Sequence, residues 1–112
     1  MIKMKRWEIW EADVPFAEKR GSKRRPVVVL SQDEVFVISL KMTSHKARYD
    51  SLEGEYELMK WKEAGLSKPT VVQCSRKLKL DASCFTGKQY GRLNATDIIG
   101  LQAMLKYMRI ND

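Results

Sequence analysis

The chain has 112 residues, of which 44% are hydrophobic, and its 21 Lys and Arg outnumber 14 Asp and Glu to give a formal net charge of +7. This length predicts one domain over residues 1–112 with enough apolar residues for a core, and it excludes a disordered basic tail. No apolar run approaches the roughly 18 residues that span a bilayer. The N-terminus has no continuous apolar segment of the kind found in secretion signals, so we expect a cytoplasmic protein without a membrane anchor. The excess positive charge makes a polyanion the first partner to consider.

The composition gives little support for a metal or cofactor site. Cys74 and Cys84 are too far apart for a CxxC motif, and we expect small buried thiols in a reducing compartment. His45 is the single histidine, and no Gly-rich phosphate loop is present. We therefore expect neither a metal nor a cofactor.

The N-terminal part of the chain predicts three strands. We expect strands over 7–14, 26–31 and 35–42. A cationic loop over 15–25 joins the first two, and a turn over 32–34 joins the second and third. From Trp7 onward, apolar residues roughly alternate with charged ones, which favours a half-buried strand. Pro26 opens an apolar, β-branched run, and the first position of a strand tolerates its missing N–H.

The middle of the chain is harder to interpret. The segment 55–62 is ambiguous, because its residues alternate like a strand but their types favour a helix. We interpret it as a strand that ends near Trp61, followed by a short helical turn closed by Gly65. We expect a loop over 43–54 before this segment and short strands over 69–74 and 77–80 after it.

A C-terminal helix is the clearest prediction. Asn94 is suited to cap it, Asp97 lies in its first turn, and Leu93 with Ile98 has the spacing of a hydrophobic staple. A helix over 95–108 would place on one face Ile98, Leu101, Met104, Leu105 and Met108. Five or six short strands and this helix predict a mainly β fold, in which the helix covers a small, strongly bent antiparallel sheet or barrel.

The densest positive feature borders the loop before the second strand and comprises Lys19, Arg20, Lys23, Arg24 and Arg25. A run of charges by itself is typical of a solvated face. Arg25, however, directly precedes Pro26 and a rigid strand. A guanidinium anchored in this way can grip a phosphate with two parallel hydrogen bonds.

A second group of polar residues, Thr43, Ser44 and His45, follows the strand over 35–42. Two hydroxyls and an imidazole at a strand end are more often turn residues than catalytic ones. Antiparallel pairing of the second and third strands, however, brings Thr43 and Arg25 to the same edge of the sheet. A guanidinium and hydroxyl donors that converge there would form a phosphate site.

The segment 25–31 (RPVVVLS) resembles a strand of the MazF/PemK toxins, which are ribonucleases of toxin–antitoxin systems. The resemblance extends in order over most of the chain. It includes the opening strand WEIWEAD (7–13), MTSH (42–45), EAGLSKPTVVQCS (63–75) and GRLN (91–94) before the amphipathic helix.

The resemblance implies a small SH3-like antiparallel barrel with a C-terminal helix, of the type shared by MazF, PemK and CcdB. It also implies a homodimer that cleaves single-stranded RNA at a short sequence without a metal and is neutralised by a cognate antitoxin. The active-site Arg and Thr of the family fall on Arg25 and Thr43. The segment 18–24 corresponds to a mobile loop that closes on RNA.

This chemistry needs few protein groups, because the RNA 2′-hydroxyl attacks the adjacent phosphate and leaves a cyclic phosphate. Arg25 suits the stabilisation of charge on the phosphoryl oxygens, and Thr43 with Ser44 could donate to one of them. Ser75 stands where PemK-like members carry an acidic residue, so the general base is left open. His45 is a candidate by its ordinary pKa, although its place in a loop favours a surface residue over a catalytic one. We expect RNA contacts from Lys19, Arg20, Lys23, Arg24, Arg76 and Lys77.

Two alternatives stay open. The chain could be a binding module on the same barrel that holds RNA or an antitoxin and cleaves weakly. It could also be a CcdB-like gyrase poison. The second alternative is less favoured, because such chains carry a Trp near the C-terminus and the last Trp here is Trp61.

Overall fold

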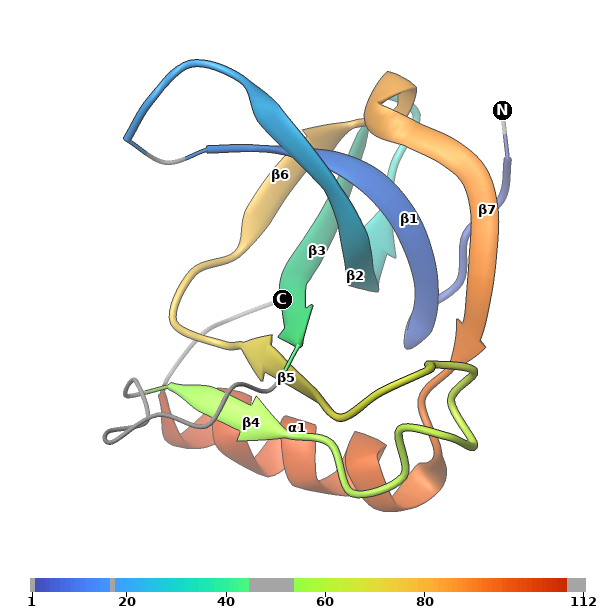
Figure 1. Ribbon diagram of the computed structural model, residues 1–112, viewed down its shortest axis with the longest axis vertical. Coiled ribbons are helices and arrows are strands. Elements are labelled where there is room, and N and C mark those ends of the chain that lie inside the picture. Colours follow the sequence, from blue (N-terminus) through green and yellow to red (C-terminus); the bar gives the residue numbers. More distant parts are fainter. Residues whose placement is uncertain (1, 17, 45–53, 109–112) are drawn as a thin grey trace.

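The computed structural model describes residues 2–16, 18–44 and 54–108. In the described part of the chain, an N-terminal run of strands is followed by one C-terminal α-helix (Figure 1). The elements are β1 (Glu8–Pro15), β2 (Ser22–Gln32), β3 (Phe36–Ser44), β4 (Glu55–Glu57), β5 (Thr70–Gln73), β6 (Leu78–Asp81), the 3₁₀ turn η1 (Ala82–Cys84), β7 (Phe85–Arg92) and α1 (Ala95–Tyr107).

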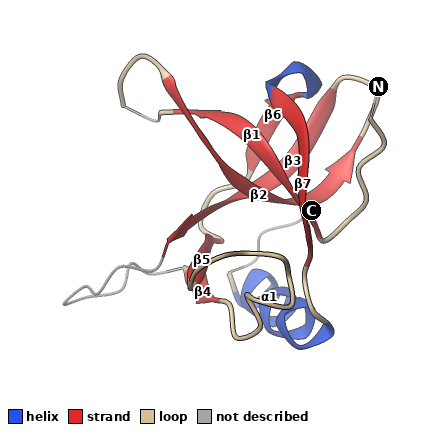
Figure 2. Ribbon diagram, turned by 45° about the vertical axis from the view of Figure 1, so that its right-hand side comes forward, coloured by secondary structure: helices blue, strands red, loops and turns tan. Residues whose placement is uncertain are grey.

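The strands form one bent antiparallel sheet with the order β4-β5-β3-β2-β1-β7, and β6 also pairs with β3. β3 changes partners along its length, because Phe36–Ser39 pairs with β6 and Met42–Ser44 pairs with β5. A register shift between Val29 and Ser31 adds to the bend of β2. The sheet is barrel-like but not closed among the described strands (Figure 2). The predicted mainly β fold with a C-terminal helix is therefore confirmed.

The helix α1 covers one face of the sheet, as the sequence predicted (Figure 2). Asn94 caps it by accepting a 3.0 Å hydrogen bond from the backbone N–H of Thr96. Leu101 and Leu105 are buried against a core that includes Ile9 and Leu40. The other residues of the predicted apolar face pack against the same core and are partly buried: Ile98, Met104 and Met108. None of the helices in the described ranges is long and apolar enough to cross a membrane.

Asp97 joins the start of α1 to the segment after β4. Its carboxylate is fully buried and accepts hydrogen bonds from the Tyr56 hydroxyl and from the backbone N–H groups of Met59 and Lys60, at 2.8–2.9 Å. Burial is the main cause that raises the pKa of Tyr56 to about 12, and the hydrogen bond to Asp97 is the second cause. A residue expected only to favour the helix N-terminus thus also docks the helix on the barrel.

The structure corrects the expected bounds of the cationic loop and of the loop after the third strand. β2 begins at Ser22, because β1 continues to Pro15 and pairs with Ser22 through Arg25. Charged residues continue a strand when a neighbouring strand supplies backbone partners, and their polarity hid this in the sequence. Thr43 and Ser44 likewise belong to β3, where they pair with β5. Pro26 lies inside β2, directly before the first pair with β3 at Val27.

Two further differences concern the C-terminal strands. β4 ends at Glu57 rather than near Trp61, and β7 was not predicted. β7 contains two glycines and mostly exposed side chains, so its sequence lacks the apolar alternation of a strand. It forms nevertheless, because β1 supplies main-chain partners. Gly65 does close the predicted turn, with a φ of 95°.

Trp7 and Trp10 are buried, with 6% and 7% of their surfaces exposed, and Trp61 is half-buried. Cys74 is a buried free thiol, as expected, whereas Cys84 is only half-buried. Burial raises the pKa of Cys74 to about 12, so this thiol is not poised for reaction.

Candidate functional site

Arg25 and Thr43 meet at one edge of the sheet. Val27 of β2 pairs with Lys41 of β3, and Arg25 and Thr43 each lie two residues beyond this last pair, at the same edge of the sheet. Both side chains line the same cavity and are half-buried. The prediction that antiparallel pairing brings the two residues together is thus confirmed.

Each of these two side chains contains a buried polar atom without a partner. The Nε of Arg25 and the Oγ1 of Thr43 are inaccessible to solvent and make no hydrogen bond to any described residue. Buried donors and acceptors in folded proteins are nearly always paired, because an unpaired group costs about 1–3 kcal/mol. The Oγ of Ser39 is also buried and unpaired but lies outside the lining of this cavity, whereas Arg25 and Thr43 share a cavity in which a ligand could supply partners.

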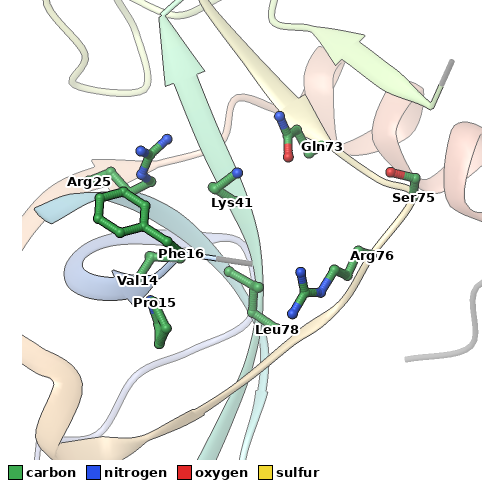
Figure 3. Close-up of a pocket in the computed structure, with 9 residues that line it drawn as sticks. All are labelled: Val14, Pro15, Phe16, Arg25, Lys41, Gln73, Ser75, Arg76 and Leu78. Carbon is green, nitrogen blue, oxygen red and sulfur yellow. The ribbon is translucent and has the colours of Figure 1, made fainter. Parts of the chain in front are cut away.

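A first cavity of about 230 Å³ lies on one side of Arg25, and we name it the Lys41 pocket (Figure 3). The described residues that line it are Val14, Pro15, Phe16, Arg25, Lys41, Gln73, Ser75, Arg76 and Leu78. This lining has three cations and no carboxylate. The pocket therefore suits an anion.

Lys41 comes from β3, with Arg25 of β2 on one side of it and Gln73 of β5 and Arg76 on the other (Figure 3). Burial and the neighbouring guanidinium groups of Arg25 and Arg76 lower the pKa of Lys41 below its ordinary value of 10.5. The ammonium group of Lys41 is therefore easier to deprotonate than that of a surface lysine.

A second cavity, the Tyr90 pocket, lies where β2 and β3 approach the segment before β5. The described residues that line it are Lys23, Arg24, Arg25, Pro26, Met42, Thr43, Ser44, Leu66, Ser67, Lys68, Thr70 and Tyr90. Arg25 thus lines both pockets.

Tyr90 is fixed in its pocket by Glu11 of β1. The Tyr90 hydroxyl donates a 3.0 Å hydrogen bond to Oε2 of Glu11, and the Thr86 hydroxyl donates a 2.9 Å bond to Oε1. These bonds from Thr86 and Tyr90 lower the pKa of Glu11, so its carboxylate is held ionised and is poorly suited to accept a proton. Glu11 acts as a support for the pocket wall.

The structure brings together most of the predicted site residues. Ser75 and Arg76 line the Lys41 pocket, and Lys23, Arg24 and Ser44 line the Tyr90 pocket. Arg24 is also tied to Asp13 by a 3.2 Å ion pair.

The remaining predicted residues lie outside both linings. Lys19 and Arg20 are exposed in the connection between β1 and β2. Lys77 is half-buried and directly follows Arg76, which lines the Lys41 pocket. The Lys19 ammonium lies 4.7 Å from the ring centre of Phe16, which itself lines the Lys41 pocket. His45 lies outside the described residues.

Sequence reasoning missed Lys41, Gln73 and Tyr90. A usable signal existed for Lys41, because it is the one charged residue in the run VFVISLKM and stands two positions before Thr43. Alternate residues of a strand share a face, so Lys41 had to point the same way as Thr43. Gln73 carried no comparable signal, since its place beside Lys41 depends on the pairing of β3 with β5.

The site has the composition of an anion-binding surface with hydroxyl donors. Among the described residues, no group of three or more His, Cys, Asp or Glu is placed to hold a metal ion. The chemistry these side chains can perform is charge stabilisation by guanidinium, hydrogen bonding by hydroxyl and proton transfer at an amine.

The protein is thus a small, bent antiparallel sheet with one covering helix and a cationic site at the sheet edge. Residues 5–108 match the model of the PemK-like, MazF-like toxins of type II toxin–antitoxin systems. Because the match covers nearly the whole chain, the protein belongs to this family. Among curated protein sequences, none is significantly similar to the chain.

Solved structures share the fold at low sequence identity. An endoribonuclease in complex with its cognate antitoxin, from a mycobacterial species, is 11% identical with a TM-score of 0.72, and the match covers 96% of this chain and 95% of that one. The Mycobacterium tuberculosis toxin MazF-mt6 is 21% identical with a TM-score of 0.65, covering 92% and 98%. At these identities the likeness extends to the fold alone.

Proposed function

We propose that the protein is an endoribonuclease toxin that cleaves single-stranded RNA at a short sequence without a metal ion. The observation that carries this proposal is the pair of buried, unpartnered atoms on Arg25 and Thr43 at the junction of two cationic pockets. A phosphate that reaches this edge would supply partners for both residues. Membership of the PemK-like and MazF-like toxin family supports the same assignment.

The reaction we propose uses the substrate as its own nucleophile. The RNA 2′-oxygen attacks the adjacent phosphorus, the bond to the 5′-oxygen breaks, and the products end in a 2′,3′-cyclic phosphate and a 5′-hydroxyl. Arg25 stabilises the negative charge that grows on the phosphoryl oxygens, and Thr43 with Ser44 donates to a non-bridging oxygen. Loss of one such donor slows an enzyme by about 10²–10³-fold.

RNA recognition would extend to both sides of Arg25. The Lys41 pocket and the Tyr90 pocket flank the guanidinium, so nucleotides before and after the cleaved bond would occupy different pockets. Phe16 and Tyr90 offer ring surfaces for base stacking. Cations outside the pockets, the exposed Lys19 and Arg20 and the half-buried Lys77, would attract the RNA backbone.

The test is cleavage of a long single-stranded RNA by the purified chain in EDTA, with the cut sites mapped by primer extension. We expect cuts at a shared short sequence and products that end in a cyclic phosphate. An oligonucleotide with a single 2′-deoxy substitution at the cut site should bind but resist cleavage. Cleavage of that oligonucleotide would contradict the mechanism.

We further propose a cognate antitoxin, a homodimer and action in the cytoplasm, where the RNA substrate is found. A neighbour of the same fold is described in complex with its cognate antitoxin. In this chain the cationic edge around Arg25 would suit an acidic segment of such a partner. Co-expression with a cognate antitoxin should relieve growth arrest, and sedimentation at micromolar concentration should give twice the chain mass.

Incubation of the purified chain with labelled single-stranded RNA also separates the ribonuclease from the two alternative functions. A catalytically weak module would retain labelled RNA or an antitoxin without cutting. A gyrase poison would leave RNA intact and unbound and would trap gyrase on DNA instead.

A further inference from the structure

Among the described residues that line the two pockets, no carboxylate is placed to act as the general base or acid of the proposed ribonuclease. The described linings of the two pockets contain no Asp or Glu, and Glu11 behind Tyr90 is occupied by two hydrogen bonds. Cleavage releases a 5′-alkoxide, which is a poor leaving group unless it receives a proton. A proton donor is therefore needed close to Arg25.

We propose that Lys41 is a catalytic residue that donates its ammonium proton to the leaving 5′-oxygen, an inference that rests on the proposed ribonuclease function. Lys41 lies on the same face of β3 as Thr43, two positions away, and lines the pocket that Arg25 also lines (Figure 3). An oxygen that leaves a phosphate held by Arg25 toward this pocket would meet the ammonium group.

Lys41 is better suited to this role than its neighbours in the described lining of the pocket. Arg25 and Arg76 carry guanidinium groups, which do not give up a proton in proteins and so cannot serve as the donor. The hydroxyl of Ser75 and the amide of Gln73 are weaker acids still. Burial and the two guanidinium groups lower the pKa of Lys41, which makes its ammonium a stronger donor.

The step balances without a further reactant besides water. The 2′-oxygen forms its bond to phosphorus and loses its proton to solvent water, while the bond between phosphorus and the 5′-oxygen breaks. The 5′-oxygen takes the proton of Lys41 and leaves as a hydroxyl. The neutral amine then regains a proton from water, so the enzyme returns to its starting state.

The experiment compares two substrates at one mapped cut site, one with the natural 5′-oxygen and one with a bridging 5′-sulfur. A thiolate leaves without protonation, so only the oxygen substrate needs the donor. We expect Lys41→Met to slow the oxygen substrate by about 10²–10⁴-fold and to cleave the sulfur substrate at close to the wild-type rate. Lys41→Arg keeps the charge but not the acidity, so it should behave in the same way.

Lys106→Met is the matched control, because Lys106 is an exposed lysine of α1 and its loss should leave both rates unchanged. Three outcomes overturn the role of Lys41: equal slowing of both substrates by Lys41→Met, no slowing of either, or full activity of Lys41→Arg on the oxygen substrate. A wild-type chain that cleaves neither substrate overturns the ribonuclease proposal itself and the role of Lys41 with it.

Discussion

Arg25 on β2 and Thr43 on β3 face the same cavity, and each has a buried side-chain atom for which the described part of the chain supplies no hydrogen-bond partner. Such an arrangement costs folding free energy and is kept where a ligand is bound. In a member of a toxin family whose fold neighbours include an endoribonuclease, this pair marks the edge of the barrel where we expect the chemistry.

Replacement of Arg25 should abolish most of the activity. Arg25→Ala removes the guanidinium that would stabilise charge on the phosphate, so we expect the cleavage rate to fall by about 10²–10³-fold. Arg92→Ala is the control, because Arg92 is an exposed residue of β7 and its loss removes the same charge. Initial rates on a labelled oligonucleotide measure both. Equal losses in the two variants would show that net charge, not position, matters.

Thr43→Val should lower activity and leave stability unchanged or higher. The substitution keeps the shape of the side chain but removes the unpaired, buried Oγ1, whose burial weakens the fold by about 1–3 kcal/mol. Urea unfolding and cleavage rates on the same samples check the two halves of the prediction. Thr96→Val, at an exposed site of α1, should change neither, and a Thr43→Val variant that loses stability would show a structural role instead.

Activity should fall as the pH rises through the pKa of Lys41. A proton donor works only in its protonated form, and the lowered pKa of Lys41 means that this form is lost at a lower pH than in an ordinary lysine. The descending limb of the pH–rate profile should therefore lie below pH 10.5. The pH–rate profile of Lys41→Met should lack that descending limb. The rates of Arg25→Ala serve as the background for alkaline hydrolysis of RNA. A limb that persists in Lys41→Met would assign it to another group.

Gly91→Ala should destabilise the fold. A Cβ at Gly91 would lie 2.1 Å from the carbonyl oxygen of Ala64, and the reciprocal Cβ at Gly65 would lie 2.0 Å from that of Tyr90. The two backbones would have to separate, which costs about 1–3 kcal/mol or more. Gly87→Ala is a useful comparison, because Gly87 has a φ of 91° but only a 3.5 Å contact, so its cost should be only the backbone penalty of an L residue at positive φ, about 1–2 kcal/mol. Urea denaturation ranks the two variants, and a smaller loss in Gly91→Ala would contradict the clash.

The contacts of Asp97 predict graded losses of stability. Asp97→Ala leaves two backbone N–H groups and the Tyr56 hydroxyl without their acceptor, so we expect a loss of about 3 kcal/mol or more. Tyr56→Phe removes one bond and should cost about 1 kcal/mol. Thermal unfolding measures both.

The same contact predicts an alkaline dependence. The folded pKa of Tyr56, about 12, lies above the ordinary value of 10.0. The stability linked to its proton is therefore fully present below pH 10.0 and is lost as the pH rises toward 12. Tyr56→Phe should remove that part of the pH dependence, and an unchanged alkaline slope would contradict it.

Local patterns were sufficient where one residue type repeats along one element. The apolar spacing of α1 and its Asn94 cap were correct from the sequence, as was the hairpin of β2 and β3. β7 was missed because its strand state depends on β1 rather than on its own side chains. The start of β2 was misplaced for a related reason, since Lys23 to Arg25 find their backbone partners on β1.

By itself, the sequence determined the class of fold, the cationic character of the protein and the two residues at the sheet edge, because periodicity, charge and the order of Arg25 and Thr43 along a hairpin are local properties. The tertiary structure decided what surrounds them. The Lys41 pocket is assembled from β1, β2, β3, β5, β6 and the segments after β1 and β5. Gln73 reaches Lys41 only through the pairing of β3 with β5. Burial and neighbouring charges set the pKa of Lys41, and both depend on residues distant in the chain that only the packed barrel brings together.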